Sequence, residues 1–456
     1  MQIIADLQLH SRFSRAVSPE MTIPNIALWA ARKGIGLVAT GDWTHPLWMR
    51  EIKNQLEEQG NGLLKLKSQT PSSNKPLFLL ATEVSCIYSQ GGRGRRVHIL
   101  IWVPSLASAD KINQEMTKRG CNLMSDGRPI VGLTGINLAE LVLSVEPKAL
   151  IIPSHAWTPW FSVYGAMSGF DSLSEAFGPY EKNIYAVETG LSSSPAMNWR
   201  IKELDRRSIV SFSDAHSGPK LGREATVFEI SGQSPVISYQ YIHDAITSTC
   251  LKVDDRKLKA KIAYTIEFYP EEGKYHYTGH RACNIRQAPE ETKKKGTICP
   301  VCGKPLTIGV MHRVEELASR SEEELQLTNL QINKLTNVKL LGTARFPYRP
   351  PFVMLVPLQE IIAEAIGSPI ASPKTQALYL RLTEQFGGEF KVLLEASTGE
   401  ISGAAGERVA MGVDKVRRRD IVIDPGYDGV FGVVKIWKEG EEGIWDSGKE
   451  QLNMFS

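Results

Sequence analysis

Residues 3–17 read IIADLQLHSRFSRAV, and in this stretch Asp6, Gln8 and His10 alternate with Leu7 and Leu9. Successive side chains of a β-strand point to opposite faces, so the alternation puts the three polar residues on one face of a short strand. The leucines then lie on the buried face. A polar trio at the carboxyl end of an apolar strand predicts a functional site.

The same arrangement recurs up to about residue 231, where apolar runs alternate with stretches of helical pattern such as IPNIALWAARKG (23–34). The runs are GLVATGD (36–42), LFLLATEV (77–84), RVHILIWV (96–103), ALIIPSHA (149–156), IYAVETG (184–190) and SIVSFSDAHS (208–217). Strands that alternate with helices predict an α/β fold built from parallel strands.

Residues of metal-binding type stand at the ends of these runs, and β/α folds carry their sites at the carboxyl ends of parallel strands. The strand-end residues are His10, Asp42, His45, Glu83, His98, His155, Glu188, Asp214 and His216. A single strand-end histidine is more often a hydrogen-bonded structural residue than a ligand. Imidazoles and carboxylates gathered at one rim are costly to bury without a cation, so the whole set predicts a metal centre.

This series resembles the polymerase and histidinol phosphatase (PHP) domain over residues 1–231. The resemblance implies a distorted seven-stranded β/α barrel that binds two or three divalent metals (Zn, Mn or Mg) and hydrolyses phosphoesters. It implies one metal bound by His10, Glu83 and Asp214 with Gln8, a second bound by Glu83, His98 and His155, and a third bound by His216 with Asp42 or His45. Among these residues, Asp214, Glu83 and His10 are expected to be catalytic.

The chain departs from the PHP pattern at two points. The first motif of the family is His-x-His, and residues 8–10 are Gln-Leu-His, so an amide oxygen, a weaker ligand, replaces one imidazole. Asp6 is the alternative ligand at this position. A further family histidine has no counterpart among Arg12, Arg15 and Ala16, which leaves the third metal site incomplete.

A second cluster lies in residues 280–302, where His280-x2-Cys283 and Cys299-x2-Cys302 form two knuckles. This spacing predicts one structural zinc ion with four protein ligands, and His276 and His312 remain alternatives to His280. Residues 252–320 hold 14 Lys plus Arg against 9 Asp plus Glu. The cations of the knuckle suit a nucleic-acid backbone, or else belong to a solvated loop: Arg281, Arg286, Lys293, Lys294 and Lys295.

The barrel pattern, the zinc knuckle and the run GVMHRVEELASR (309–320) together resemble the endonuclease Q family over almost the whole chain. The more specific pieces are HSRFSRA (10–16), TGDWTHP (40–46), PSHAWTPWFS (153–162), ETGLSSSPAMNWR (188–200) and SDAHSGPKLGREA (213–225). The resemblance implies a DNA-repair endonuclease that cuts the phosphodiester on the 5′ side of a deaminated base (uracil, hypoxanthine or xanthine) or of an abasic site. Composition and spacing alone reach only metal-dependent phosphoester hydrolysis.

Two segments are candidates for DNA contact. Trp157, Trp160, Phe161 and Tyr164 follow His155 and suit stacking on an extruded base, although aromatic residues in such loops also pack into the core. The loop SQGGRGRR (89–96) brings Arg93, Arg95 or Arg96 toward phosphate oxygens, and a solvated hairpin turn is the equal alternative.

The final residues, QLNMFS, resemble the pentapeptide that binds the bacterial sliding clamp. Gln451 and Leu452 precede a spacer and the apolar anchors Met454 and Phe455. Apolar side chains at a free terminus favour burial in a partner's groove, so we expect a clamp partner and a bacterial source. A terminus folded onto its own body is the alternative.

We expect five parts: a PHP-type barrel (1–231), a connector (232–265), a zinc-binding module (266–312), a mixed α+β domain (313–440) and a flexible tail (441–456). The mixed domain carries a basic run, Arg417 to Arg419, which either grips DNA or braces the zinc module. A secretion signal and a long apolar segment are not found, so we expect a cytoplasmic protein without a membrane partner.

Two other functions remain open at this level. The barrel alone permits a small-molecule phosphoesterase, but that function leaves the zinc knuckle, the basic segment and the tail unexplained. A clamp-tethered DNA adaptor with a weakened barrel is the other, and Gln8 is its best argument.

Overall fold

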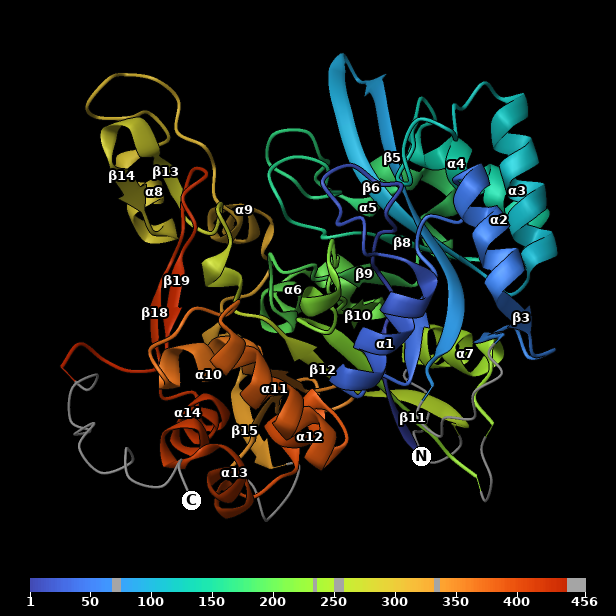
Figure 1. Cartoon of the computed structure of the whole chain (residues 1–456). Helices are drawn as coiled ribbons and strands as arrows, with labels where there is room; N and C mark the ends of the chain where they lie inside the picture. Colours follow the sequence, from blue (N-terminus) through green and yellow to red (C-terminus); the bar gives the residue numbers. More distant parts are fainter. Residues whose placement is uncertain (68–74, 233–235, 250–257, 332–336, 441–456) are drawn as a thin grey trace.

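The computed structural model describes residues 1–67, 75–232, 236–249, 258–331 and 337–440. Its centre is one large mixed sheet with the strand order β15-β16-β17-β12-β11-β1-β2-β5-β4-β3, which β6, β7 and β8 extend through pairings with β5 and β6 (Figure 1). The strands of the first part are β1 Gln2–Asp6, β2 Leu37–Ala39, β3 Leu56–Glu58, β4 Leu64–Leu66, β5 Leu77–Gln90, β6 Arg93–Val103, β7 Ile130–Val131, β8 Leu150–Pro153 and β11 Ala225–Ile230. The fold is therefore α/β, as predicted.

The strands are not all parallel. β1, β2 and β5 pair in parallel, but β5 and β6 form a long antiparallel hairpin that runs from Leu80 opposite Val103 to Gln90 opposite Arg93. Gly91 and Gly92 make the turn with φ of 61° and 73°, the pair of positive values that a two-residue hairpin requires. The expectation of parallel strands throughout is corrected here, because two glycines reverse the chain where we expected a crossover.

The last strands of the first part stand apart from the sheet. β9 (Ala186–Glu188) and β10 (Ser208–Val210) form a separate parallel pair, and Leu9 makes an isolated parallel bridge to Ala215. Among the described residues, strand pairing thus does not join β8 to β9. The seven-stranded barrel stays a prediction.

Helices cover the sheet and give the strands their burial partners. They are α1 Ile23–Lys33, α2 Pro46–Gln55, α3 Leu106–Lys118, α4 Gly135–Val145, α5 Leu173–Phe177, α6 Pro195–Trp199 and α7 Tyr239–Thr249. In α1, Ile23, Ile26 and Ala30 are fully buried at helical spacing, and Gly34 ends the helix in the left-handed region with φ of 83°. Among the described residues, no helix combines the length and apolar character that a membrane crossing requires.

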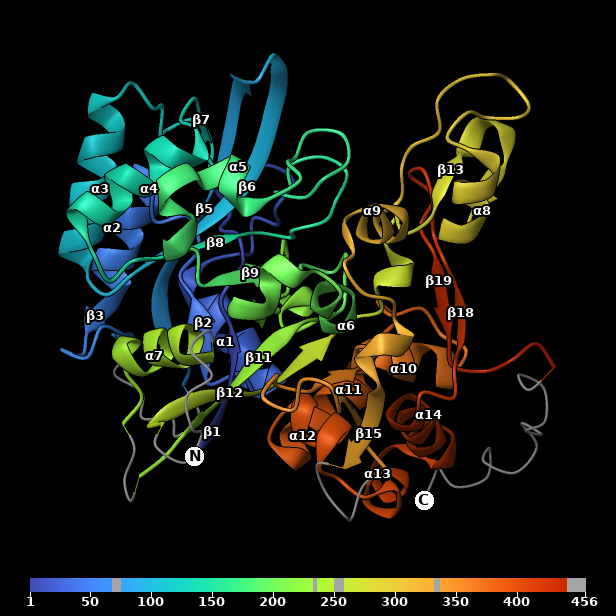
Figure 2. The ribbon, with the colours of Figure 1, turned by 180° about the vertical axis from the view of Figure 1, so that it is seen from behind.

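The knuckle of residues 280–302 and the C-terminal part follow on the other side of the molecule (Figure 2). The elements are β13 Thr278–His280, β14 Ile285–Gln287, α8 Pro289–Lys295, α9 Val310–Leu317, β15 Leu327–Gln331, β16 Lys339–Thr343, β17 Phe352–Met354, α10 Leu358–Ala365, α11 Pro373–Phe386, α12 Glu389–Leu394, α13 Thr398–Ala405, α14 Glu407–Arg418, β18 Val422–Asp424 and β19 Val433–Lys435. β18 and β19 form a hairpin beside the knuckle in both views.

The expected connector is more than a linker. It contains α7, and it continues into β12 (Ala260–Glu267), which pairs with β11 on one side and in parallel with β17 on the other. The first part and the C-terminal part therefore share one sheet. Arg417 is 2% exposed and donates to the carbonyls of Val392, Leu393 and Ala396, so it caps α12 and does not face solvent.

A buried pair of acids joins β12 to the strands beside it. Glu224 and Glu267 are fully buried, and Ser211 and Thr265 donate hydrogen bonds to Glu267. Burial raises the pKa of Glu267 to about 7 and, together with repulsion from Glu267, raises that of Glu224 well above its usual value.

We expect Glu267→Gln to stabilise the protein at pH 8 and to have little effect at pH 5. The raised pKa means that the folded state keeps a proton that the unfolded state releases, so stability falls as the pH rises from the unfolded value of 4.5 through about 7. Glutamine removes this loss, worth about 3 kcal/mol. Denaturant unfolding at both pH values measures it, and an equal effect at both would contradict the assignment.

Candidate metal centre

Six side chains from distant parts of the chain form two adjacent ligand groups. One group is His10, Asp214 and His216, and the other is Glu83, His98 and His155; within each group the ligand atoms lie within 4.8 Å of one another. The groups touch, because His10 Nε2 is 3.1 Å from Glu83 Oε2 and 3.2 Å from Asp214 Oδ1. Glu83 therefore stands between them.

Two of these residues, and Asp42 beside them, leave their strands through strained backbone. Asp42, His155 and Asp214 follow β2, β8 and β10, and each has positive φ (41°, 30° and 46°). Positive φ is uncommon outside glycine and is retained where the surrounding structure enforces it, often at functional sites. These three turns direct the side chains toward the ligand groups.

Asp42 orients His10 from behind. Its Oδ1 is 3.0 Å from His10 Nδ1, while Ser11 and Ser14 donate hydrogen bonds to Oδ2 at 2.6 to 2.8 Å. Burial opposes a charge on His10, but attraction to Asp42 and hydrogen bonds to Asp214 and Glu83 outweigh it and raise the pKa of His10 well above its usual value. A carboxylate behind a histidine orients the ring so that Nε2 faces a metal, and a bound cation would replace the proton at Nε2.

In the second group, three atoms point at one another. His98 Nδ1 lies 2.6 Å from Glu83 Oε1 and 3.2 Å from His155 Nε2. Burial lowers the pKa of His98 to about 4, so the imidazole is neutral at pH 7, as a ligand must be. Glu188, the strand-end residue after β9, accepts the backbone N–H of His155 at 2.8 Å and so supports this loop from outside the group.

The predicted third site is not assembled as expected. His216 joins His10 and Asp214, and its Nδ1 donates to the carbonyl of Asp214 at 2.7 Å, which leaves Nε2 free to bind a cation. His45 instead stacks on Phe13 at 4.6 Å, and Asp42 is engaged with His10. The alternative ligand Asp6 accepts hydrogen bonds from Ser213 and Gly222 and lies outside both groups: its oxygens are already used.

The side-chain amide of Gln8 reaches the centre, and only its nitrogen has a hydrogen-bond partner in the described part of the chain. Its Nε2 donates to Glu83 Oε2 at 2.9 Å, whereas the buried Oε1 has no hydrogen-bond partner among the described residues. A buried oxygen without a donor, next to imidazoles and carboxylates, fits a divalent cation.

We expect Gln8→His to increase the metal content of the purified protein. The imidazole is the stronger ligand and would stand beside Glu83 where the amide now stands. Elemental mass spectrometry of the purified variant and wild type measures the difference. An unchanged metal content would show that residue 8 does not contribute to cation binding.

The expected DNA-contacting residues divide into two kinds. Trp157 and Tyr164 are both 0% exposed, and their ring centroids stack 4.8 Å apart. They belong to the core and are not available to stack on a base. Phe161 is half-buried against His98 at 4.8 Å, and Trp160 is half-buried near Tyr275.

The arginines of the loop 89–96 lie on the β5–β6 hairpin. Arg93 and Arg96 are exposed, and the guanidinium of Arg96 lies 5.7 Å from the ring of Phe161. Arg95 donates to the carbonyl of Gly169 and lies over the ring of Phe170 at 4.1 Å, so its guanidinium is already engaged.

One charged residue of the centre is absent from the sequence-based set. Arg128 lies in the loop before β7, and its Nη1 is 3.4 Å from His10 Nε2 and 3.8 Å from Glu83 Oε1. Burial opposes its charge, but attraction to Glu83 and Asp214 outweighs burial and raises its pKa. The stretch SDGRP (125–129) has no recognisable motif, so only the tertiary structure reveals this position.

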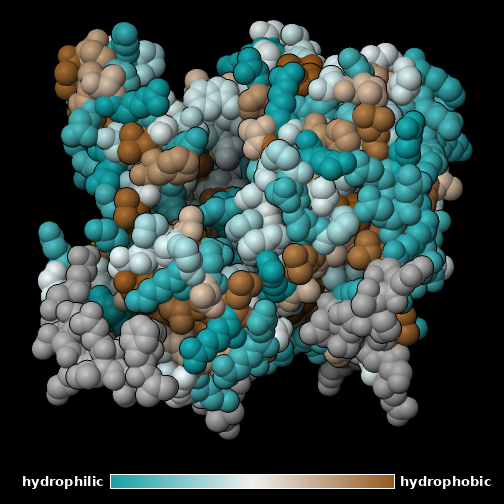
Figure 3. All heavy atoms as spheres, in the orientation of Figure 1, coloured by the Kyte–Doolittle hydropathy of each residue, from teal (hydrophilic) through white to brown (hydrophobic). Residues whose placement is uncertain are grey.

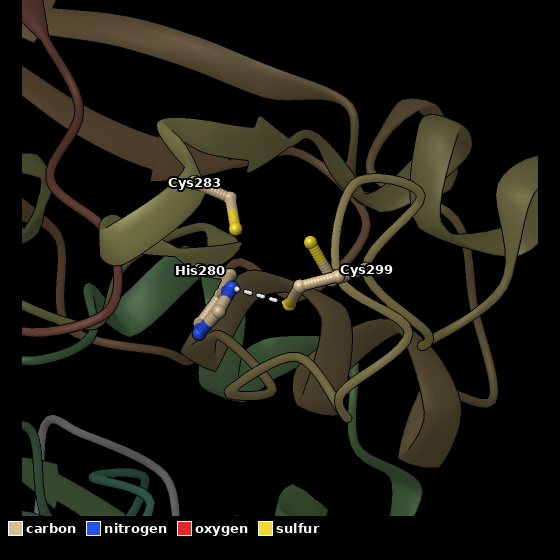
Figure 4. A group of neighbouring side chains, drawn as sticks. His280, Cys283 and Cys299 are labelled. Carbon is tan, nitrogen blue, oxygen red and sulfur yellow. Dashed lines mark hydrogen bonds between the residues drawn. The ribbon is translucent and has the colours of Figure 1, made fainter.

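The second cluster also converges. Figure 4 shows His280 from the end of β13, Cys283 three residues later in the chain and Cys299 from the loop after α8. Their ligand atoms are turned toward a common point. With Cys302 they form a four-residue group within 4.8 Å, in which His280 Nδ1 is 3.4 Å from Cys302 Sγ. Desolvation opposes ionisation of Cys299, but the N–H groups of Cys302 and Val301 lower its pKa to about 6. The group fits the predicted zinc ion.

The alternatives to His280 lie elsewhere. His276 and His312 are buried and belong to no ligand group among the described residues. The clamp-like residues 451–455 fall outside the described part of the chain.

Comparisons with known proteins cover the chain at two scales. A family model described as the MJ0043 C-terminal domain matches residues 357–420. Protein YqxK of Bacillus subtilis is 29% identical, and the match covers 95% of this chain and 99% of YqxK. Protein MJ0043 of Methanocaldococcus jannaschii is 31% identical over a match that covers 61% of this chain. The same match covers 31% of MJ0043, which is the longer protein.

Two solved structures match almost end to end. The lesion-specific endonuclease PfuEndoQ of Pyrococcus furiosus is 31% identical with a TM-score of 0.78, and the match covers 96% of both chains. A complex of endonuclease Q with a 27-mer duplex that has an abasic lesion at the active site matches with the same identity and TM-score, over 99% of this chain and 100% of that chain. Similarity of this extent in both sequence and structure shows that the chain belongs to the endonuclease Q family.

Proposed function

We propose that this protein is a metal-dependent DNA-repair endonuclease that cuts the phosphodiester 5′ of a deaminated base or an abasic site. The observation that carries the proposal is the contact of the two ligand groups through Glu83 in a chain of the endonuclease Q family. The related structure with an abasic duplex at its active site supports DNA as the substrate.

The ligand sets define what the chain contributes. His10, Asp214 and His216, with Gln8, would hold one divalent cation, and Glu83, His98 and His155 would hold another. Bound cations of this kind supply an activated water and neutralise the charge that develops during phosphoester hydrolysis. Asp42 keeps His10 in its ligating tautomer, and Glu188 fixes the backbone of His155.

The shape of the surface supports a duplex as substrate. The zinc module, with exposed Lys294 and Lys304, and the β5–β6 hairpin, with exposed Arg93 and Arg96, rise on opposite sides of a hollow (Figure 3). Exposed cations on both sides of a hollow suit the phosphates of DNA. A small-molecule substrate would not reach the exposed cations of the zinc module and of the β5–β6 hairpin at the same time.

The test uses an end-labelled duplex with a single uracil, hypoxanthine or abasic site, together with Mg²⁺ or Mn²⁺. We expect a nick immediately 5′ of the lesion, and we expect Asp214→Ala to abolish it. An undamaged duplex and a sugar phosphate serve as the comparison substrates. Cleavage of the sugar phosphate alone would instead support a small-molecule phosphoesterase, and no cleavage of either would support a DNA-binding adaptor.

The tail carries a separate part of the proposal. The residues Gln451, Leu452, Met454 and Phe455 would bind a bacterial sliding clamp, on the strength of their sequence alone. Binding of the full chain to a purified clamp, with Leu452→Ala and Phe455→Ala as controls, tests this partner.

A further inference from the structure

Arg128 is the one basic side chain of the described residues that bridges both ligand groups. Its Nη1 lies 3.4 Å from His10 Nε2, in the first group, and 3.8 Å from Glu83 Oε1, in the second. The side chain is 23% exposed, so Arg128 is only partly buried at this position.

The backbone on both sides of Arg128 is fixed to the ligand-bearing segments. Gly127 N–H donates to the carbonyl of Phe13 at 3.0 Å, and the carbonyl of Pro129 accepts from Ser85 N–H at 3.0 Å. Thr44 Oγ1 also donates to the carbonyl of Gly127 at 3.3 Å. The loop is therefore anchored to the segments that follow β1 and β2, and to β5 two residues beyond Glu83.

Residue 127 must be glycine for the loop to come this close. A Cβ at this position would lie 2.3 Å from Ser14 Oγ and 2.4 Å from Asp42 Oδ2. Any larger residue would push the loop away from the pair that orients His10, and Arg128 would move with it. The position of the guanidinium is thus built into the site.

The contacts leave the guanidinium without a matched carboxylate. Among the described residues, its nearest acid is Glu83 at 3.8 Å, which is beyond hydrogen-bond distance. An arginine fork pairs best with two oxygens of a carboxylate or a phosphate. In the proposed reaction, the group that arrives here is the phosphodiester of DNA.

We propose that Arg128 is a catalytic residue that binds a nonbridging oxygen of the scissile phosphate and stabilises the charge that develops on it. This inference rests on the proposed function. It assigns to one fixed arginine a part of the charge neutralisation that would otherwise fall entirely to the cations.

The experiment compares wild type, Arg128→Gln, Arg128→Lys and the control Arg119→Gln on a duplex with a single uracil. Arg119 is an exposed arginine shortly before the same loop, and its side chain donates to the carbonyl of Asn137. We expect the single-turnover rate of Arg128→Gln to fall by about 10²- to 10³-fold, as for loss of one donor to a developing oxyanion. The single-turnover rate of Arg128→Lys should stay well below that of wild type, because an ammonium group does not reproduce the two parallel donors of a guanidinium. Arg119→Gln should keep the wild-type rate.

Two further measurements separate catalysis from structure. Metal content by elemental mass spectrometry should be equal in wild type and Arg128→Gln. A duplex with sulfur in place of one nonbridging oxygen at the scissile phosphate should slow wild type, and this effect should be smaller in Arg128→Gln, because the partner of that oxygen is gone. A merely structural residue would leave the sulfur effect unchanged.

The outcomes are distinct. An active wild type with an equally active Arg128→Gln overturns the inference alone. Extra metal bound by Arg128→Gln at an undiminished rate also overturns it, since the guanidinium would then only occupy a cation position. A wild type that cuts no lesion duplex overturns the proposed function and this inference with it.

Discussion

Replacing Glu83 with glutamine is expected to reduce lesion incision by about 10³-fold or more, because bound metals supply several kcal/mol of transition-state stabilisation. Glu83 is 2% exposed and serves both ligand groups: Oε2 faces His10 and Gln8, and Oε1 faces His98 at 2.6 Å and His155 at 3.5 Å. An amide keeps one oxygen and turns a donor toward the other group. Both cation positions are therefore weakened by one change.

Single-turnover incision and metal content should fall together in this variant. Glu203→Gln is a matched control, because Glu203 is a half-buried acid that accepts hydrogen bonds from Tyr164 and Leu173 outside the centre. We expect that variant to keep both its metals and its rate. If Glu83→Gln retained full metal content and full activity, the two groups would not be the metal centre.

Much of the centre could be predicted because ligand types follow buried strands. His10, Glu83, His98, His155, Asp214 and His216 were all expected at one rim, and the structure brings them into two touching groups. The role of Asp42 could not be predicted in this way. Asp42 could either bind a metal itself or orient the imidazole of His10 from behind. Which role it has depends on how the imidazole is turned, and the sequence does not record that orientation.

The direction of β6 illustrates a different limit. Away from the turn, β5 and β6 are buried on both faces. Their apolar runs therefore lack the alternation of polar and apolar residues that marks a strand with one solvent-exposed face. Such runs read alike in parallel and antiparallel sheets. The turn residues Gly91 and Gly92 were the available signal.

Arg128 and β12 were missed for a common reason, which is that both act over long sequence separations. Arg128 meets His10 across 118 residues. β12 pairs with β17, far along the chain, and so joins two parts that composition had divided. Local pattern predicts elements, whereas contacts of this kind depend on how the elements pack.

A buried ion pair holds the C-terminal helices against the first part of the chain. Lys33 Nζ, at the end of α1, lies 2.6 Å from Glu389 Oε2, and the two side chains are 2% and 4% exposed. Glu389 also accepts hydrogen bonds from Leu358 N–H at 3.0 Å and from the Tyr379 hydroxyl at 2.8 Å. One carboxylate thus connects α1, α10, α11 and α12.

Lys33→Met is expected to lower the free energy of unfolding by about 3 to 5 kcal/mol, the usual cost of leaving a buried charge without its partner. Methionine preserves most of the aliphatic volume, so the loss reports the missing charge rather than a cavity. The double variant Lys33→Met/Glu389→Gln should recover most of the loss, since glutamine still accepts from Leu358 and carries no charge. Denaturant unfolding of the full chain measures all three proteins. A single variant as stable as wild type would mean that water or a proton already satisfies Glu389, and that the ion pair does not join the two parts.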